Sequence, residues 1–301
     1  MRRRDFLLAS AAVAGAGRIW GQPGSDKAKL ARMGSMTQNV QTLVKDPDHP
    51  DDPKRTLDLL DLPQLYKERL GVHYIEPTCA HFASTEKDYL NEFKARVRKA
   101  GLEINQISLG ALAQQRGQDM PIMTISSPER TNRIAAIDLT KQWIDHAAYL
   151  GCPRVMLHQG HLAPEVRKET IAALQAMTDY GKSKNVKVTL ELRQSDWHVI
   201  VELLKATGCW MNCHSQNPPE ALRVMFPMTS GSMHLVYGMG GRGRRGGSRG
   251  NQPPRDPDVV LHEQMQVIKA AHYNGIFSIE HGGPDPFAAV QTVVKALLRE
   301  M

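Results

Sequence analysis

Hydrophobic and polar positions along the chain follow two alternating periods. Short segments rich in Val, Ile, Leu and Met alternate with longer segments whose apolar residues recur every three to four positions. The first pattern is typical of buried β-strands and the second of amphipathic helices. The last helical segment, 285–301, places these residues on one face: Val290, Val293, Val294, Leu297 and Leu298.

The pattern predicts eight strands, each followed by a helix. The strands are expected at 29–36, 72–77, 102–110, 153–160, 186–193, 209–214, 232–238 and 276–283. The helices are expected at 62–71, 86–101, 128–151, 163–185, 196–208, 218–226, 256–275 and 285–301. The Pro/Asp-rich segment 45–55 is expected to be a loop.

Eight strand–helix units favour a single-domain (β/α)8 TIM barrel, expected to cover residues 26–301. The chain of 301 residues, of which 41% are hydrophobic, can bury a sizeable core. An open, doubly wound α/β sheet is the alternative. A glycine-rich phosphate loop after the first strand would support that alternative, but the sequence has none there.

The N-terminus has the pattern of an export signal. A basic head is followed by a short apolar run from Phe6 to Gly17, which is too short and too rich in Ala and Gly for a stable membrane span. The pair Arg3-Arg4 before Asp5-Phe6-Leu7 resembles the bacterial twin-arginine signal, RRxFL. The resemblance implies that residues 1–25 are a signal peptide and linker, that the twin-arginine export machinery is a partner, and that the protein reaches the periplasm already folded.

The positive charge is confined to two segments. The net charge is +7, of which residues 1–17 carry +2 and the Arg/Gly segment 240–250 carries +4, so +1 is left for the rest of the chain. A nearly neutral body argues against nucleic acid as a partner. The four cysteines have no CxxC spacing and are expected to be buried thiols.

Alternation within the last four strands predicts a cluster of polar side chains inside the barrel. Side chains of alternate strand residues face the barrel axis, and catalytic groups of barrels lie at the C-terminal ends of strands. One metal-competent side chain per strand then faces inward near that end: Glu191, His214, His234 and Glu280. A divalent cation would compensate the charges of such a cluster. A carboxylate–histidine hydrogen-bond network without a metal is the alternative.

With these residues in place, the chain resembles the sugar phosphate isomerase/epimerase superfamily, the xylose isomerase-like TIM barrels that include ketose 3-epimerases. The motifs LELR, MHLVYG and SIEHGG carry the resemblance and supply Glu191, His234 and Glu280. In that family the sixth strand ends with Asp, whereas this chain has His214. The resemblance implies one divalent metal held by all four residues. The additional imidazole favours Mn, Zn, Co or Fe over Mg.

The resemblance further implies a metal-dependent isomerase or epimerase of a sugar or sugar derivative. The reaction would be proton transfer next to a carbonyl through an enediolate, with Glu191 and Glu280 as acid and base as well as metal ligands. A metal-dependent lyase or hydrolase acting on an oxidised sugar, and a sugar-binding protein without catalysis, are alternatives. An endonuclease is disfavoured by the nearly neutral body and by the small set of candidate ligands.

Further polar residues follow the strand ends and are candidates for binding a small-molecule sugar substrate. They are Glu76, His158, His161, Arg193, Trp197, Asn217 and Arg242. Trp197 has an indole ring on which a sugar could stack, and Arg242 begins the Arg/Gly segment. For each of them, hydrogen bonding or packing at the rim of the barrel is an equally open interpretation. The sequence leaves the oligomeric state open, including a homo-oligomer.

Overall fold

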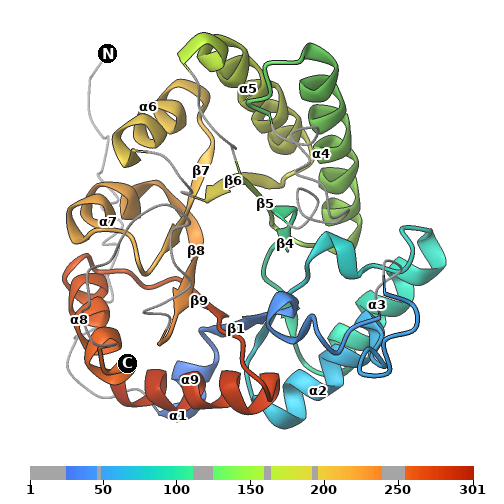
Figure 1. Ribbon diagram of the computed structural model, residues 1–301, viewed down its shortest axis with the longest axis vertical. Coiled ribbons are helices and arrows are strands. Elements are labelled where there is room, and N and C mark those ends of the chain that lie inside the picture. Colours follow the sequence, from blue (N-terminus) through green and yellow to red (C-terminus); the bar gives the residue numbers. More distant parts are fainter. Residues whose placement is uncertain (1–24, 46–48, 111–124, 159–163, 192–195, 239–254) are drawn as a thin grey trace, which may run out of the picture.

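The computed structural model is a nearly closed barrel of nine parallel strands surrounded by helices (Figure 1). It describes residues 25–45, 49–110, 125–158, 164–191, 196–238 and 255–301. The strand order is β3-β2-β1-β9-β8-β7-β6-β5-β4, so strands that follow one another in sequence pair in the sheet, except β3 and β4, which form its two edges, and β1 also pairs with β9. The predicted TIM barrel is confirmed.

The described elements alternate as the sequence predicts. The strands are β1 (Met33–Met36), β2 (Tyr74–Glu76), β3 (Glu103–Ile104), β4 (Ile107–Ser108), β5 (Arg154–His158), β6 (Lys187–Glu191), β7 (Trp210–His214), β8 (Thr229–Val236) and β9 (Ile276–Glu280). The helices are α1 (Asp26–Leu30), α2 (Leu62–Arg69), α3 (Lys87–Lys99), α4 (Arg130–Leu150), α5 (Arg167–Ser183), α6 (Trp197–Thr207), α7 (Pro219–Met225), α8 (Pro257–Ala270) and α9 (Pro286–Glu300).

Local chemistry defines the helix ends. Helix α6 begins after Asp196, whose carboxylate accepts a hydrogen bond from the backbone N–H of His198, and it ends at Gly208 with φ of 65°. Helix α4 ends in the same way at Gly151, with φ of 76°. A glycine adopts this left-handed conformation without steric strain, so these two positions end the helices just before the next strands.

Helix α1 differs from the expected first strand, which was predicted to begin at residue 29. Ser25 caps the helix, since its hydroxyl accepts from the backbone N–H of Ala28. The ammonium of Lys29 donates to the carbonyl oxygen of Leu298 at the end of α9, at 2.6 Å. The cap and this anchor favour a helical turn before β1, which begins at Met33.

The expected third strand, 102–110, is divided into β3 and β4. β3 pairs with β2 and β4 pairs with β5, so the two halves lie at the two edges of the sheet. An isolated parallel bridge joins Thr78 to Ser108 across the gap. The residues between the halves, Asn105 and Gln106, direct their side chains to Glu76 in the interior. The barrel therefore closes through a broken strand lined with amide side chains.

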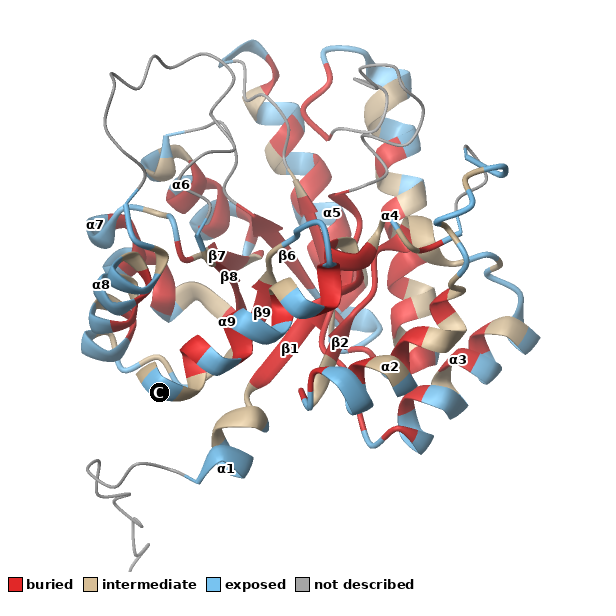
Figure 2. Cartoon of the chain, turned by 60° about the horizontal axis from the view of Figure 1, so that its bottom comes forward, coloured by how far each residue is buried: buried red, intermediate tan, exposed pale blue. Residues whose placement is uncertain are grey.

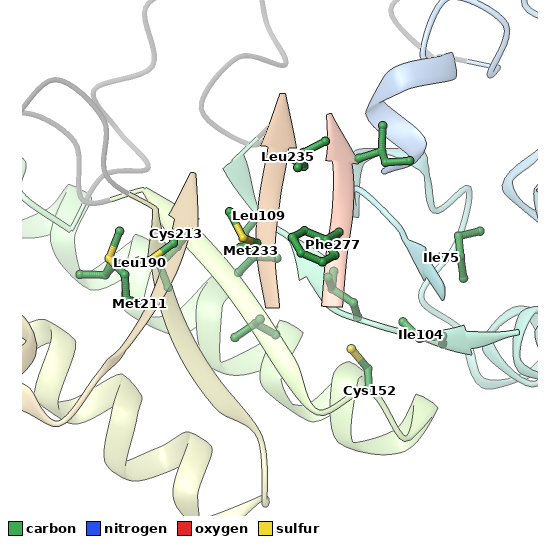
Figure 3. Packing of buried hydrophobic residues seen from close by; sticks show 14 of the residues in the cluster. Ile75, Ile104, Leu109, Cys152, Leu190, Met211, Cys213, Met233, Leu235 and Phe277 are labelled. Atoms are coloured by element: carbon green, nitrogen blue, oxygen red, sulfur yellow. The ribbon is translucent and has the colours of Figure 1, made fainter. Parts of the chain in front are cut away.

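The hydrophobic core lies between the barrel and its helices. Figure 3 shows outward-facing residues of the last strands packed together, and Figure 2 shows that the helices bury one face and expose the other. Fully or almost fully buried members of this layer include Leu190, Met211, Cys213, Met233, Leu235 and Phe277. Burying one large apolar side chain contributes roughly 1.5–3 kcal/mol. The four cysteines are buried, as expected.

The register between β7 and β8 shifts within the barrel. Met211 pairs with Thr229, but Cys213 pairs with Met233 and His214 with His234, so β8 contains two more residues than β7 over this stretch. Gly231 lies in the shifted stretch with φ of 94°. The guanidinium of Arg154 donates to the adjacent carbonyl of Ser230, at 2.9 Å from Nη2. The shift sets which β8 side chain stands level with His214.

Among the residues with described positions, none of the helices is both long enough and apolar enough to cross a bilayer.

Candidate active site

Three of the four predicted inward side chains form a compact cluster at the C-terminal ends of the strands. Glu191 ends β6, Glu280 ends β9 and His234 lies in β8. One ligand atom from each lies within 4.8 Å of the others, which is the spacing of groups that could hold a metal ion. Nδ1 of His234 lies 3.6 Å from Oε2 of Glu191 and 3.6 Å from Oε2 of Glu280. The imidazole thus faces two carboxylates.

Glu76, in the interior of the barrel, fixes the orientation of His234. The fully buried ring brings Nε2 to 2.9 Å from Oε1 of Glu76, and a carboxylate accepts, so Nε2 is the donor. Nδ1 is buried and has no hydrogen-bond partner among the described residues. Burial lowers the pKa of His234, but the charges of Glu76 and Glu191 outweigh it and hold the pKa well above its usual value. The surroundings of Nδ1 therefore favour a positive charge.

Glu191 is buried and paired with His158 of the neighbouring strand. Nε2 of His158 lies 2.9 Å from Oε2 of Glu191. Burial would raise the pKa of Glu191, but the hydrogen bond from His158 and the charges of His158 and His234 hold it well below its usual range. A Cβ at Gly110 would lie 2.5 Å from Cε1 of His158, so the ring can occupy this place only beside a glycine.

Glu280 has the more open carboxylate of the cluster. Its side chain is 21% exposed, against 2% for Glu191. Nε2 of His214, at the end of β7, lies 3.5 Å from Oε2 of Glu280. Burial would raise the pKa of Glu280, and the contact with His214 helps to hold it below its usual value. Within the cluster, Glu280 is therefore the side chain that solvent reaches most readily.

Glu76 lies inside the barrel and not at its rim, where the sequence pattern placed a substrate contact. It is fully buried. Besides His234, its oxygens accept hydrogen bonds from Ser278 Oγ at 2.6 Å, Gln106 Nε2 at 3.1 Å and Asn105 Nδ2 at 3.3 Å. Both oxygens are therefore taken by groups of the barrel, and the contact that bears on the site is the one with His234.

Sequence reasoning did not single out Asn105 and Gln106. These two side chains close the polar layer beneath the site, since Asn105 also donates to Ser232 and Gln106 accepts from Thr189. Their signal was present as an adjacent amide pair in the middle of the strand segment 102–110. An amide pair at such a place indicates interior hydrogen bonding, because buried polar groups need partners.

The remaining predicted substrate-binding residues lie at different places. The indole of Trp197 stacks on the imidazole of His198, with ring centroids 3.6 Å apart, at the start of α6. Asn217 accepts through Oδ1 from the backbone N–H of His214, at 2.9 Å, and so orders the turn after β7. His161, Arg193 and Arg242 lie outside the described residues, as do residues 1–24 of the expected signal segment 1–25 and the Arg/Gly segment.

The donor set fits a divalent cation. Two carboxylates and one imidazole nitrogen converge, and the imidazole is held by a hydrogen bond from its other nitrogen to a buried carboxylate. A hydrogen bond of this kind fixes the ring tautomer and orientation of metal-binding histidines. Nδ1, which has no hydrogen-bond partner among the described residues, lies between the two carboxylates, where a cation would satisfy all three groups.

Comparisons with known proteins agree with this architecture. A profile of the family described as "Xylose isomerase-like TIM barrel" matches residues 66–299. No curated protein sequence matches the chain. Many solved structures do, at identities that establish the fold alone.

Three of these structures illustrate the range. An L-ribulose 3-epimerase has 15% identity and a TM-score of 0.65, covering 90% of this chain and 95% of its own. A D-allulose 3-epimerase from Methylomonas sp., in complex with D-allulose, has 12% identity and a TM-score of 0.64, covering 90% and 97%. A xylose isomerase-like TIM barrel protein from Mycobacterium smegmatis, in complex with magnesium, has 16% identity and a TM-score of 0.58, covering 91% and 98%.

Proposed function

Because the chain belongs to the xylose isomerase-like TIM barrel family, we propose that it is a metal-dependent isomerase or epimerase of a sugar or sugar derivative. The observation that carries the proposal is the convergence of Glu191 and Glu280 on Nδ1 of His234. Solved structures with the same fold include L-ribulose and D-allulose 3-epimerases, which supports sugar chemistry next to a carbonyl.

The metal site of the proposal consists of Glu191, His234 and Glu280. A bound divalent cation would supply electrostatic stabilisation for negative charge that develops on the substrate oxygens. A preference for Mn, Zn, Co or Fe over Mg requires two imidazole ligands, and a structure of the same fold has been solved with magnesium. We therefore propose that the bound ion is one of these five divalent metals, which metal analysis of the purified protein identifies.

Glu191 and Glu280 are the proposed acid and base. They approach the interior from β6 and β9, which are separated in the sheet by β7 and β8. One carboxylate can remove a proton from the carbon next to the carbonyl while the other returns one. Their different burial gives them different roles toward solvent: a proton on the more open Glu280 exchanges with water more readily than one on Glu191, which His158 covers.

Metal analysis and a substrate screen test this function together. The purified full chain is expected to hold close to one divalent metal ion, and to convert a ketose into its epimer or isomer only when the metal is bound. In deuterated water the product should carry deuterium at the carbon next to the carbonyl. Less than a tenth of a metal ion per chain, or an unsaturated or cleaved product, would contradict the isomerase proposal; the second result would favour the lyase or hydrolase.

We also propose that residues 1–25 direct export through the twin-arginine machinery to the periplasm, which leaves residues 26–301 as the mature barrel. The support is the sequence Arg3-Arg4 ahead of the short apolar run. Replacing Arg3 and Arg4 with lysines is expected to keep the protein in the cytoplasm of a bacterial host. Cell fractionation measures this, and unchanged periplasmic recovery would contradict the proposal.

A further inference from the structure

His214 has two polar contacts that together determine which of its ring nitrogens carries the proton. On one side, Nδ1 lies 3.2 Å from the backbone nitrogen of Gln216. On the other side, Nε2 lies 3.5 Å from Oε2 of Glu280. The ring is therefore held between a group that can only donate and a group that, when ionised, can only accept.

Only one tautomer of the neutral ring serves both contacts. A backbone N–H is always a donor, so Nδ1 must be the accepting nitrogen and carry the lone pair. The proton of the neutral ring is then on Nε2, where it points toward Glu280. A metal ion at Nε2 would need the lone pair there and would place the proton on Nδ1, against the N–H of Gln216. The geometry thus opposes coordination through Nε2.

We infer that His214 is a positioning residue that directs its Nε2 proton toward Glu280 and is not a fourth metal ligand. The inference rests on the proposed function, because it concerns the same metal site. It replaces the ligand role expected from the sequence. The cluster of groups spaced for a metal agrees with this assignment, since it contains Glu191, His234 and Glu280 without His214.

If His214 is not a metal ligand, each carboxylate of the site contacts one histidine that does not bind the metal. Glu191 contacts His158 at 2.9 Å, and Glu280 contacts His214 at 3.5 Å. Each carboxylate also lies 3.6 Å from Nδ1 of His234. Two histidine–carboxylate pairs therefore flank His234, whose Nδ1 faces both carboxylates.

This arrangement also changes the expected metal preference. Two imidazole ligands would favour Mn, Zn, Co or Fe over Mg, whereas one imidazole with two carboxylates also suits Mg. Three protein ligands are typical of catalytic metal sites, which keep positions open for water or substrate.

The tautomer of His214 can be measured directly. In the full-length protein labelled with ¹⁵N-histidine, NMR distinguishes a protonated from an unprotonated ring nitrogen, and the signals that disappear in His214→Gln identify the residue. We expect Nε2 of His214 to be protonated and Nδ1 unprotonated, both before and after addition of Zn²⁺. Loss of the Nε2 proton on addition of Zn²⁺ would overturn the inference.

The number of imidazole ligands provides a second measurement. Pulsed EPR of the Cu²⁺-loaded protein is expected to detect one coordinated imidazole in the wild type, one in His214→Gln and none in His234→Ala. Glutamine can donate an N–H from a similar position, so His214→Gln should also bind Cu²⁺ within about threefold of the wild-type affinity. Two coordinated imidazoles in the wild type, with one lost in His214→Gln, would overturn the inference.

The two proposals fail in different ways. If the wild type binds neither Zn²⁺ nor Cu²⁺, the metal-dependent function is contradicted, while the NMR tautomer of the metal-free protein still decides the role of His214. If metal binds and a second imidazole coordinates it, the function stands and the role assigned to His214 falls.

Discussion

Replacing Glu191 with glutamine is expected to lower the turnover of the sugar substrate by roughly 10²–10⁴-fold, the contribution of a positioned general acid or base. Glutamine has nearly the same shape but cannot accept a proton, and it is a weaker metal ligand. Incorporation of solvent deuterium into the substrate should fall with turnover. Steady-state kinetics and NMR of the product in deuterated water measure the two effects.

Glu169→Gln is the matched control for this change. Glu169 is exposed in α5 and its position gives it no contact with the cluster, so the same chemical change should leave turnover unaltered. If Glu191→Gln still exchanged deuterium at the wild-type rate, Glu191 would have no acid or base role.

Replacing His234 with alanine is expected to abolish metal binding and to lower the free energy of unfolding by about 3–5 kcal/mol. The ring is fully buried between Glu76 and Glu191, both of which are also buried. Removing the protonated imidazole leaves the buried carboxylates of Glu76 and Glu191 without the positive charge that His234 supplies. Denaturant unfolding of the metal-free protein measures the loss of stability, and titration with Zn²⁺ measures the loss of binding.

His262→Ala is the matched control, because His262 also faces a carboxylate but lies at the surface. Nδ1 of His262 is 3.1 Å from Oε2 of Glu300, and its side chain is 57% exposed. A pair of this kind contributes about 0–1 kcal/mol. Equal losses of stability in the two variants would contradict the view that buried charge compensation holds the site together.

A milder companion to His234→Ala is Glu76→Gln, which keeps a hydrogen-bond acceptor for Nε2 of His234 but removes the buried charge. Loss of such an outer partner lowers metal affinity by roughly 10–100-fold. An unchanged affinity would mean that Glu76 serves the interior of the barrel and not the metal site.

The fold could be predicted because each strand and helix carries its own periodicity, and the barrel follows from eight repeats of one unit. The predicted inward faces of β6 to β9 agree with the structure for the same reason. Alternation decides that Thr189 and Glu191 share a face, and Thr189 indeed contacts Gln106 across the interior. These features depend on spacing along a single strand, which a sequence contains.

Contacts between distant segments could not be predicted in this way. The break at Asn105 and Gln106 follows from their hydrogen bonds to Glu76, which is 29 and 30 positions away in the chain. The proton position on His214 depends on the backbone N–H of Gln216, two residues further along a turn that no hydrophobic pattern describes. The residue types identify the candidate ligands, but the role of each ligand depends on the distant groups to which it is hydrogen-bonded.

The register shift between β7 and β8 determines which residue of β8 takes part in the site. If the pairing of Met211 with Thr229 continued without interruption, the residue opposite His214 would be Ser232 and not His234. The two additional residues, accommodated at Gly231 and held by Arg154 near the opposite mouth of the barrel, thus exchange a hydroxyl for an imidazole at the level of Glu191 and Glu280. The ligand that β8 supplies therefore depends on the register of the strand as well as on the identity of its residues.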